Sequence, residues 1–115
     1  MGRFEEHSGH RHLRLQELVL EELQALLRDD VADPSLDPVR FTALVLSVDY
    51  RHARVHFALA MTEEEARARL PSVTRALQRV SPFLRARLSD AIDLKRVPDL
   101  AFLFDAALPE GEGSP

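Results

Sequence analysis

The 115-residue chain has no cysteine and only four glycines, and both shortages exclude particular kinds of site. Without cysteine there is no disulfide and no thiolate metal centre, and nothing implies an oxidising compartment. The glycines all lie near the termini, at Gly2, Gly9, Gly111 and Gly113. A glycine-rich loop that lets the backbone approach a phosphate is therefore absent, whether a P-loop, a dinucleotide fingerprint or a GxxG loop.

The chain also lacks a long apolar run. No stretch approaches the roughly 20 residues that span a bilayer, and the first twelve residues have no apolar signal core. We therefore expect a cytoplasmic protein without membrane contact. With 45% hydrophobic residues, the length suits one core and is too short for two ordinary domains. We expect a flexible lead-in over residues 1–12, a single domain over 13–108 and a disordered tail over 109–115.

Charge is unevenly distributed along the sequence. The formal net charge is −4, which taken alone argues against nucleic acid. Between residues 67 and 96, however, eight basic residues accompany only two acidic ones, so this segment carries +6 and the remainder −10. A local positive field attracts a polyanion whatever the net charge. Arginine accounts for 14 of the 15 basic residues, so codon bias and an ordinary solvated helix face are alternative explanations.

Hydrophobic periodicity predicts the first elements. Apolar residues recur at helical spacing over residues 13–29, and a turn-rich loop with two prolines follows at 33–38. Period-2 alternation predicts strands at 41–47 and 53–61, which residues 49–52 connect, and a third strand at 100–104. In the first strand, Leu44 and Leu46 share one face, and Phe41 should lie on the other.

The helical region before the third strand contains two prolines. Thr62 and Glu65 have the spacing of a capping box, so a helix should begin there. Pro71 either separates or kinks its first turns. Pro82 interrupts the apolar pattern again and predicts two consecutive helices that meet at residues 80–82, with Ser81 as the cap of the second.

These elements give the order α-β-β-α-α-β. A hairpin joined to a third strand through two helices makes an α+β fold, a three-stranded sheet with the helices packed on one face. This is the order of a type II KH domain, but the GxxG loop with which KH modules clamp nucleic acid is missing. Helix termini and arginine side chains would have to bind instead.

Three stretches resemble the ribosome-binding factor A family, bacterial assembly factors of the small ribosomal subunit. The family has a KH-like fold in which a kinked helix pair replaces the glycine loop. The stretches are residues 47–55, which read SVDYRHARV, residues 76–85, and residues 96–105, which read RVPDLAFLFD. With the first helix, the resemblance covers about residues 13–105. The family usually has Ala-x-Gly at the kink, where this chain has Val80-Ser81-Pro82, and a proline at the first helical position could serve the same purpose.

The resemblance implies a ribosome biogenesis factor without enzymatic activity or cofactor. It would bind the immature 30S small subunit and its 16S rRNA during late maturation and processing of the 5′ end of that RNA. Its expected partners are the small ribosomal subunit, its rRNA and a ribosome-associated GTPase that promotes release, and we expect a monomer. The clustered basic charge then predicts the RNA-binding residues: Arg75, Arg79, Ser81, Arg85, Arg87, Lys95 and Arg96.

Two alternatives of a different class stay open. One is a protein-interaction module that uses an apolar open sheet face, unless the first helix or a tail covers that face. The residues of this face would be Phe41, Ala43, Val45, Ala58, Ala60, Ala101 and Leu103. The other is an enzyme on a KH-like scaffold, for which the sequence offers no catalytic constellation. His7, His10 and His12 make a poor metal site, because a polar lead-in lacks the supporting contacts that ligands need.

Overall fold

The structure, a computed structural model, describes residues 9–109. Its elements are α1 (His10–Asp29), the 3-10 helix η1 (Pro34–Leu36), β1 (Val39–Leu46), β2 (His52–Leu59), α2 (Glu63–Ala91) and β3 (Asp99–Ala107). Most of the predicted lead-in and nearly all of the predicted tail, residues 1–8 and 110–115, lie outside the described residues. Within residues 9–109, neither α-helix is apolar enough over a sufficient length to cross a membrane.

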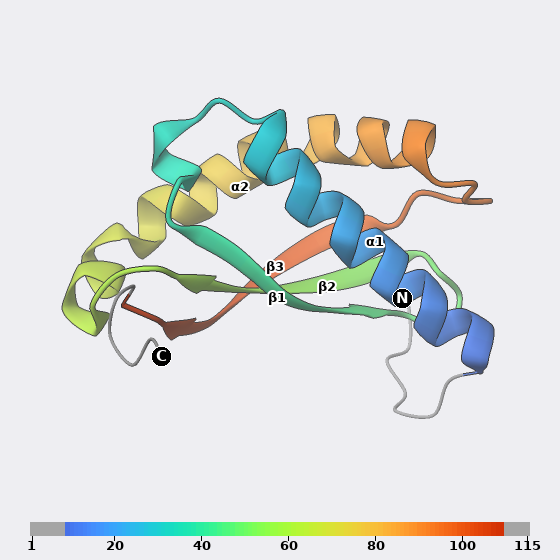
Figure 1. Ribbon diagram of the computed structural model, residues 1–115, viewed down its shortest axis with the longest axis horizontal. Coiled ribbons are helices and arrows are strands. Elements are labelled where there is room, and N and C mark those ends of the chain that lie inside the picture. Colours follow the sequence, from blue (N-terminus) through green and yellow to red (C-terminus); the bar gives the residue numbers. More distant parts are fainter. Residues whose placement is uncertain (1–8, 110–115) are drawn as a thin grey trace.

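β2 is the central strand of a three-stranded mixed sheet. β1 pairs with it antiparallel, and β3 pairs parallel along its other edge. The parallel pairing requires a long crossover connection, which α2 supplies. Both helices lie on the same face of the sheet (Figure 1). The predicted α+β fold, with helices packed on one face of three strands, is therefore confirmed.

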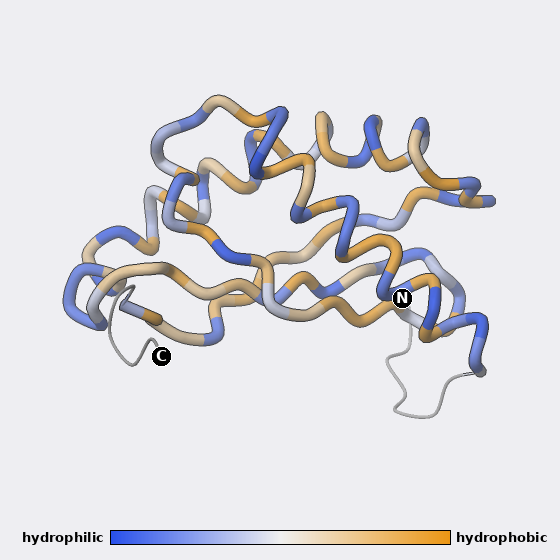
Figure 2. The backbone as a smooth tube through the Cα atoms, in the orientation of Figure 1, coloured by the Kyte–Doolittle hydropathy of each residue, from blue (hydrophilic) through white to orange (hydrophobic). Residues whose placement is uncertain are grey.

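The core lies between the sheet and the helices. Val55, Phe57 and Leu59 of β2 are at most 1% exposed, as their alternation predicted. Figure 2 shows apolar residues concentrated in the strands, whereas hydrophilic residues recur along both helices, as expected for helices with one buried side. The buried helical residues of this core are Val19, Leu23 and Leu26 of α1 and Ala66, Val73, Ala76, Leu77, Leu84 and Leu88 of α2.

The prediction of two separate helices meeting at residues 80–82 is wrong. α2 is one continuous helix, with Pro71 and Pro82 both inside it. A proline removes one backbone donor and opposes a straight helix, but it does not end a helix whose flanking turns are held by packing. Leu77 and Leu84, on either side of Pro82, are fully buried and supply that packing. The element order is therefore α-β-β-α-β. Figure 1 shows that α2 changes direction between its yellow and orange parts, so the helix is bent but not interrupted.

A β-bulge in β1 changes which side chains face the core. The register between β1 and β2 shifts between Phe41 and Ala43, so Phe41 pairs with Phe57 and is only 4% exposed. The prediction that Phe41 lies on the open face is wrong, because strict alternation does not allow for an extra residue in a strand. Leu44 and Leu46, beyond the bulge, are buried as predicted.

A polar network crosses the open face of the sheet. The Thr42 hydroxyl donates to Asp105 Oδ2 at 3.1 Å, and His56 Nδ1 donates to Asp105 Oδ1 at 3.0 Å. These three residues come from β1, β3 and β2, so the network ties all three strands together. Arg54 is exposed in β2 and Leu103 is 39% exposed in β3. The open face is therefore more polar than the sequence predicted, which weakens the case for an apolar docking face.

α1 begins at His10, three residues earlier than predicted. His12 is only 8% exposed, and its ring donates from Nε2 to the Leu46 carbonyl oxygen at 3.1 Å. The same ring lies 4.9 Å from the ring of Tyr50. Residues 10–12 are therefore part of the packed helix and not of a flexible lead-in.

Three side chains of α1 satisfy backbone groups of the edge strand β1. Gln16 Oε1 accepts from the Leu46 N–H at 2.9 Å, and Gln24 Nε2 donates to the Phe41 carbonyl at 2.9 Å. With the His12 bond, they occupy groups that an exposed edge strand would offer to another chain.

Candidate nucleic-acid interface

α2 carries most of the predicted basic residues. It begins at the predicted capping box, in which Thr62 Oγ1 accepts from the Glu65 N–H at 3.2 Å and Glu65 Oε1 accepts from the Thr62 N–H at 3.0 Å. The Thr62 N–H and then its hydroxyl hold the pKa of Glu65 below its ordinary value, which favours a charged carboxylate at the positive end of the helix. Because the buried stripe of α2 faces the sheet, Arg75, Arg79 and Arg87 are left exposed.

Two of these arginines are paired with acidic residues at the end of α1 and after it. Arg79 Nη2 lies 3.4 Å from Asp33 Oδ2, and Arg87 Nη2 lies 3.3 Å from Asp30 Oδ2. The Arg87 guanidinium also lies over the Phe83 ring, 5.6 Å from its centre. Exposed pairs of this kind contribute at most about 1 kcal/mol, yet they neutralise part of the positive field that the sequence predicts. An RNA phosphate at either arginine would have to displace a carboxylate.

Arg85 faces inward, toward the segment that leads into β3. Its Nε donates to the Pro98 carbonyl at 3.0 Å, and its Nη2 donates to the Val97 carbonyl at 3.1 Å. Nη2 also lies 3.4 Å from Asp99 Oδ1. The guanidinium therefore holds the start of β3 against α2, and Arg85 acts on the surface mainly by positioning its neighbours.

Ser81 does not lie at a helix N-terminus. Because α2 runs through Pro82 without a break, the prediction that Ser81 caps a second helix is wrong. The free N–H groups that make a helix N-terminus attractive to phosphate are absent at this point of α2. Ser81 itself is half-buried, and a contact between its hydroxyl and RNA stays a prediction.

Arg75, Lys95 and Arg96 are exposed and have no ionic or hydrogen-bonding partner among residues 9–109. They do not form one cluster. Arg75 lies 16 residues before the end of α2, which at the helical rise is roughly 24 Å. Lys95 and Arg96 follow that end, in the segment before β3. The predicted residues thus form an extended band along α2 and beyond it, not a compact patch.

A hollow of about 520 Å³ lies where this band ends. Three segments far apart in the sequence form it, namely the β1–β2 turn with the start of β2, Arg85 of α2, and the residues that lead into β3. Arg51 and His52 are not among the predicted RNA-binding residues, because the alternation of the flanking strands identifies residues 49–52 only as their connection. The one sequence hint was their place in the family-like stretch SVDYRHARV. The lining residues are Arg51, His52, Arg85, Arg96, Val97 and Asp99.

The β1–β2 turn beside this hollow is rigidly built. The Ser47 side chain is fully buried, and its hydroxyl donates to Asp49 Oδ1 at 2.7 Å and accepts from the His52 N–H at 2.9 Å. Asp49 Oδ1 also accepts from the Arg51 N–H at 3.1 Å. The Ser47 bond first, and then the Arg51 bond, lower the pKa of Asp49. Tyr50 has a φ of 62°, a left-handed conformation that residues other than glycine seldom adopt.

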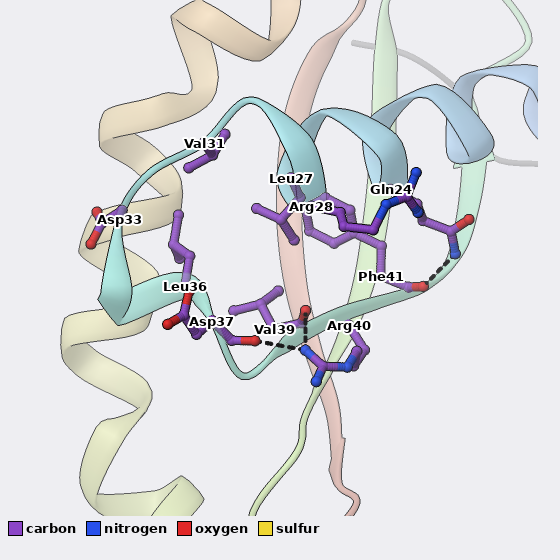
Figure 3. Close-up of a pocket in the computed structure, with 10 residues that line it drawn as sticks. All are labelled: Gln24, Leu27, Arg28, Val31, Asp33, Leu36, Asp37, Val39, Arg40 and Phe41. Atoms are coloured by element: carbon purple, nitrogen blue, oxygen red, sulfur yellow. Dashed lines mark hydrogen bonds between the residues drawn. The ribbon is translucent and has the colours of Figure 1, made fainter.

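A second hollow, of about 640 Å³, lies between the end of α1, η1 and β1 (Figure 3). Its floor is apolar, and its rim holds two arginines and two aspartates, a balance that does not favour a polyanion. Arg40 Nη1 already donates to the carbonyl oxygens of Asp37 at 2.7 Å and Val39 at 3.1 Å. The lining residues are Gln24, Leu27, Arg28, Val31, Asp33, Leu36, Asp37, Val39, Arg40 and Phe41.

The histidines considered as metal ligands do not come together. His7 lies outside the described residues, His10 is exposed in the first turn of α1, and the His12 ring is bonded to β1. Over residues 9–109 no group of three or more histidine, aspartate or glutamate side chains is placed to hold a metal ion.

Several known proteins similar to this chain belong to the same family. The model of the ribosome-binding factor A family matches residues 11–113. Ribosome-binding factor A of Heliobacterium modesticaldum is 39% identical over 104 residues, covering 90% of this chain and 83% of the relative. The Dechloromonas aromatica protein of that name is 35% identical, covering 85% of this chain and 76% of the relative.

Solved structures of ribosome-binding factor A have the same fold. The crystal structure of the Thermus thermophilus protein matches with a TM-score of 0.69 at 25% identity, covering 90% of this chain and 99% of that chain. The KH-like architecture predicted from the sequence is therefore confirmed. Since the family model spans residues 11–113 and a relative with 39% identity covers 90% of the chain, this chain belongs to the ribosome-binding factor A family.

Proposed function

We propose that this chain binds the immature 30S subunit through its 16S rRNA and assists late maturation, including processing of the 5′ end of that RNA. The family consists of non-enzymatic factors that act in 30S assembly. The observation that carries the proposal is a homology model of Thermus thermophilus ribosome-binding factor A, which was fitted into a cryo-EM map of a complex with the 30S subunit. This chain matches those coordinates with a TM-score of 0.55 at 27% identity, covering 93% of this chain and 100% of that chain.

The charge distribution supports an RNA partner. Arg75, Lys95 and Arg96 are exposed and unpaired within the described part of the chain, so they are available to phosphates. Each phosphate that a cation neutralises releases condensed counterions, which favours binding in spite of the net negative charge. Arg79 and Arg87 would have to exchange Asp33 and Asp30 for phosphates before they could join the contact surface.

The proposal includes the setting in which the protein acts. A monomer would act in the cytoplasm, where ribosomes assemble, with the small subunit and its rRNA as partners. A ribosome-associated GTPase is proposed as the factor that promotes release. Several simultaneous phosphate contacts dissociate slowly, since they must break together, and remodelling of the subunit by a second factor would speed this step.

Sedimentation with ribosomal particles tests the proposal. Tagged protein in a cell extract should comigrate with free and precursor 30S particles and not with 70S ribosomes, and its loss should raise the level of 16S rRNA with an unprocessed 5′ end. A triple Arg75→Ala, Lys95→Ala, Arg96→Ala variant should leave the particles. The matched control is Arg67→Ala, which removes an exposed cation whose one ion pair within residues 9–109 is with Glu63 of the same helix, at 3.6 Å. Wild-type protein that stays at the top of the gradient would refute the proposal.

A further inference from the structure

The hollow between the β1–β2 turn and the segment before β3 gathers basic side chains from both. Arg51 comes from the turn and His52 from the start of β2, and Arg96 comes from the other wall. Figure 1 shows the turn and the segment that leaves α2 at the same end of the molecule. The backbone joins them directly, because the Asp99 N–H donates to the Arg51 carbonyl at 2.9 Å. Arg51 and Arg96, 45 positions apart in the chain, therefore share one cavity.

The positive charge of this hollow is not neutralised from within. Asp99 is the one acidic residue in its lining, and its carboxylate lies 3.4 Å from Arg85. In the described part of the chain, the one ion pair of Arg51 is long, with Arg51 Nε 4.0 Å from Asp49 Oδ2, and the Arg51 side chain is 56% exposed. Arg96 is exposed and has no partner within residues 9–109. Two guanidinium groups are thus available to an anion.

Both walls of the hollow are held in place before any ligand arrives. The Ser47 and Asp49 bonds lock the turn, and Tyr50 keeps a strained left-handed conformation within it. Backbone strain of this kind persists where the surrounding structure enforces it, often at binding sites. On the other wall, Arg85 bonds the carbonyl oxygens of Val97 and Pro98. Because the backbone on both sides is already ordered, less conformational entropy is lost when a ligand binds.

We propose that this hollow binds the phosphate backbone of the RNA, with Arg51 and Arg96 each contacting one of two phosphate groups and Arg85 as the residue that positions the wall. Guanidinium groups favour this ligand because their planar donors match two phosphate oxygens at once. The volume of about 520 Å³ exceeds one phosphate, and the site is open to solvent, so a phosphodiester within a longer chain can enter. This inference rests on the proposed function and extends the RNA-binding surface to the β1–β2 turn.

Binding of purified 30S precursor particles by full-length variants tests the proposal. The Arg51→Ala, Arg96→Ala double variant should bind on the order of tenfold to a hundredfold more weakly, and its log–log salt slope should be less steep by about 1.5, since two phosphate contacts are lost. The control Arg67→Ala should match wild type in both respects. Thermal melting shows whether each variant folds, and Arg51→Gln with Arg96→Gln repeats the test with side chains of similar length. Wild-type affinity and slope in folded double variants would overturn the site while leaving the proposed function intact.

An NMR titration separates this inference from the proposed function. A ten-nucleotide single-stranded RNA, added to labelled full-length protein, should shift the backbone amide signals of Arg51, His52 and Arg96, and the shifts should diminish at high salt. The signals of Arg67 should not move. If wild-type protein fails to bind 30S particles, the proposed function is wrong, but the titration still tests whether RNA binds in the hollow. Unmoved signals at Arg51 and Arg96 would overturn the site.

Discussion

At the scale of single residues, Phe57 is the side chain on which the core of the sheet most depends. It is 1% exposed, it pairs in register with Phe41 on one side, and its ring lies 5.7 Å from that of Phe104 on the other. Removing its ring would leave a cavity between the sheet and the helices, which the packed neighbours cannot fill.

We expect Phe57→Ala to lower the free energy of unfolding by about 3 to 5 kcal/mol. Phe104→Ala is the matched control, because Phe104 contacts the same ring but is 38% exposed on an edge strand. Its substitution should cost well under half as much, since solvent already reaches one side of the ring. Urea denaturation of both variants measures the difference, and equal losses would contradict this assignment of the core.

Asp105 makes the stability of the sheet depend on pH. The hydrogen bond from His56, and then that from Thr42, hold the pKa of Asp105 below its ordinary value of 3.8. A carboxyl group whose pKa is lower in the folded state stabilises the fold above its ordinary pKa, and this contribution is lost as the pH falls through the folded-state value. Asp105→Asn should therefore be less stable than wild type at neutral pH, and the difference should vanish in strong acid. Urea midpoints between pH 7 and pH 2 check this, and a constant difference would show that the charge of Asp105 does not matter.

At the scale of elements, α2 raises the question of what its internal proline does. Pro82 is exposed, and it removes one backbone hydrogen bond from a helix that otherwise runs from Glu63 to Ala91. The packing of Leu77, Leu84 and Leu88 tolerates this loss and keeps the helix intact. Pro82 therefore affects the direction in which α2 runs and not the stability of the helix.

We expect Pro82→Ala to leave the protein folded and to weaken its binding to the 30S subunit. Alanine restores a donor and removes the ring that opposes a straight helix, so the two parts of α2 should align more closely. The basic residues on either side of the bend would then no longer match the same RNA surface. Thermal melting and 30S affinity measured on the same sample distinguish the outcomes. Unchanged affinity in a folded variant would mean that the bend has only a structural role.

At the scale of the whole molecule, ion pairs within the protein determine how many basic side chains are available to contact RNA phosphates. The sequence predicts six basic RNA-binding residues, but Arg79 and Arg87 are paired with carboxylates and Arg85 is bonded to backbone carbonyls. Of the residues assigned to the RNA-binding surface, those still available to phosphates are Arg51, Arg75, Lys95 and Arg96.

About four neutralised phosphates give a log–log salt slope between roughly −2.8 and −3.6 for 30S binding. Affinity measured between about 50 and 200 mM salt checks this value. A slope steeper than about −4.5 would show that Arg79 and Arg87 exchange their aspartates for phosphates on binding. A flat dependence would contradict RNA binding through these residues altogether.

The amino-acid sequence alone predicted those features that depend on residues close together in the chain. The capping box of Thr62 and Glu65, the alternation of Val55, Phe57 and Leu59, and the family-like stretch before and through β3 all depend on residues a few positions apart. Such short-range patterns reflect the local geometry of helices and strands, which the chain carries wherever it packs. They were sufficient for the α+β fold and for the family.

Features that need distant residues to meet became clear only in the folded molecule. Phe41 joins the core through a bulge that depends on pairing with β2, and Pro82 stays inside a helix because the sheet holds the turns around it. The pairing of Arg79 with Asp33 joins positions 46 apart, and the hollow of Arg51 and Arg96 joins positions 45 apart. The burial and ion pairing of these residues depend on which distant residues folding places beside them, and no local sequence pattern specifies those residues.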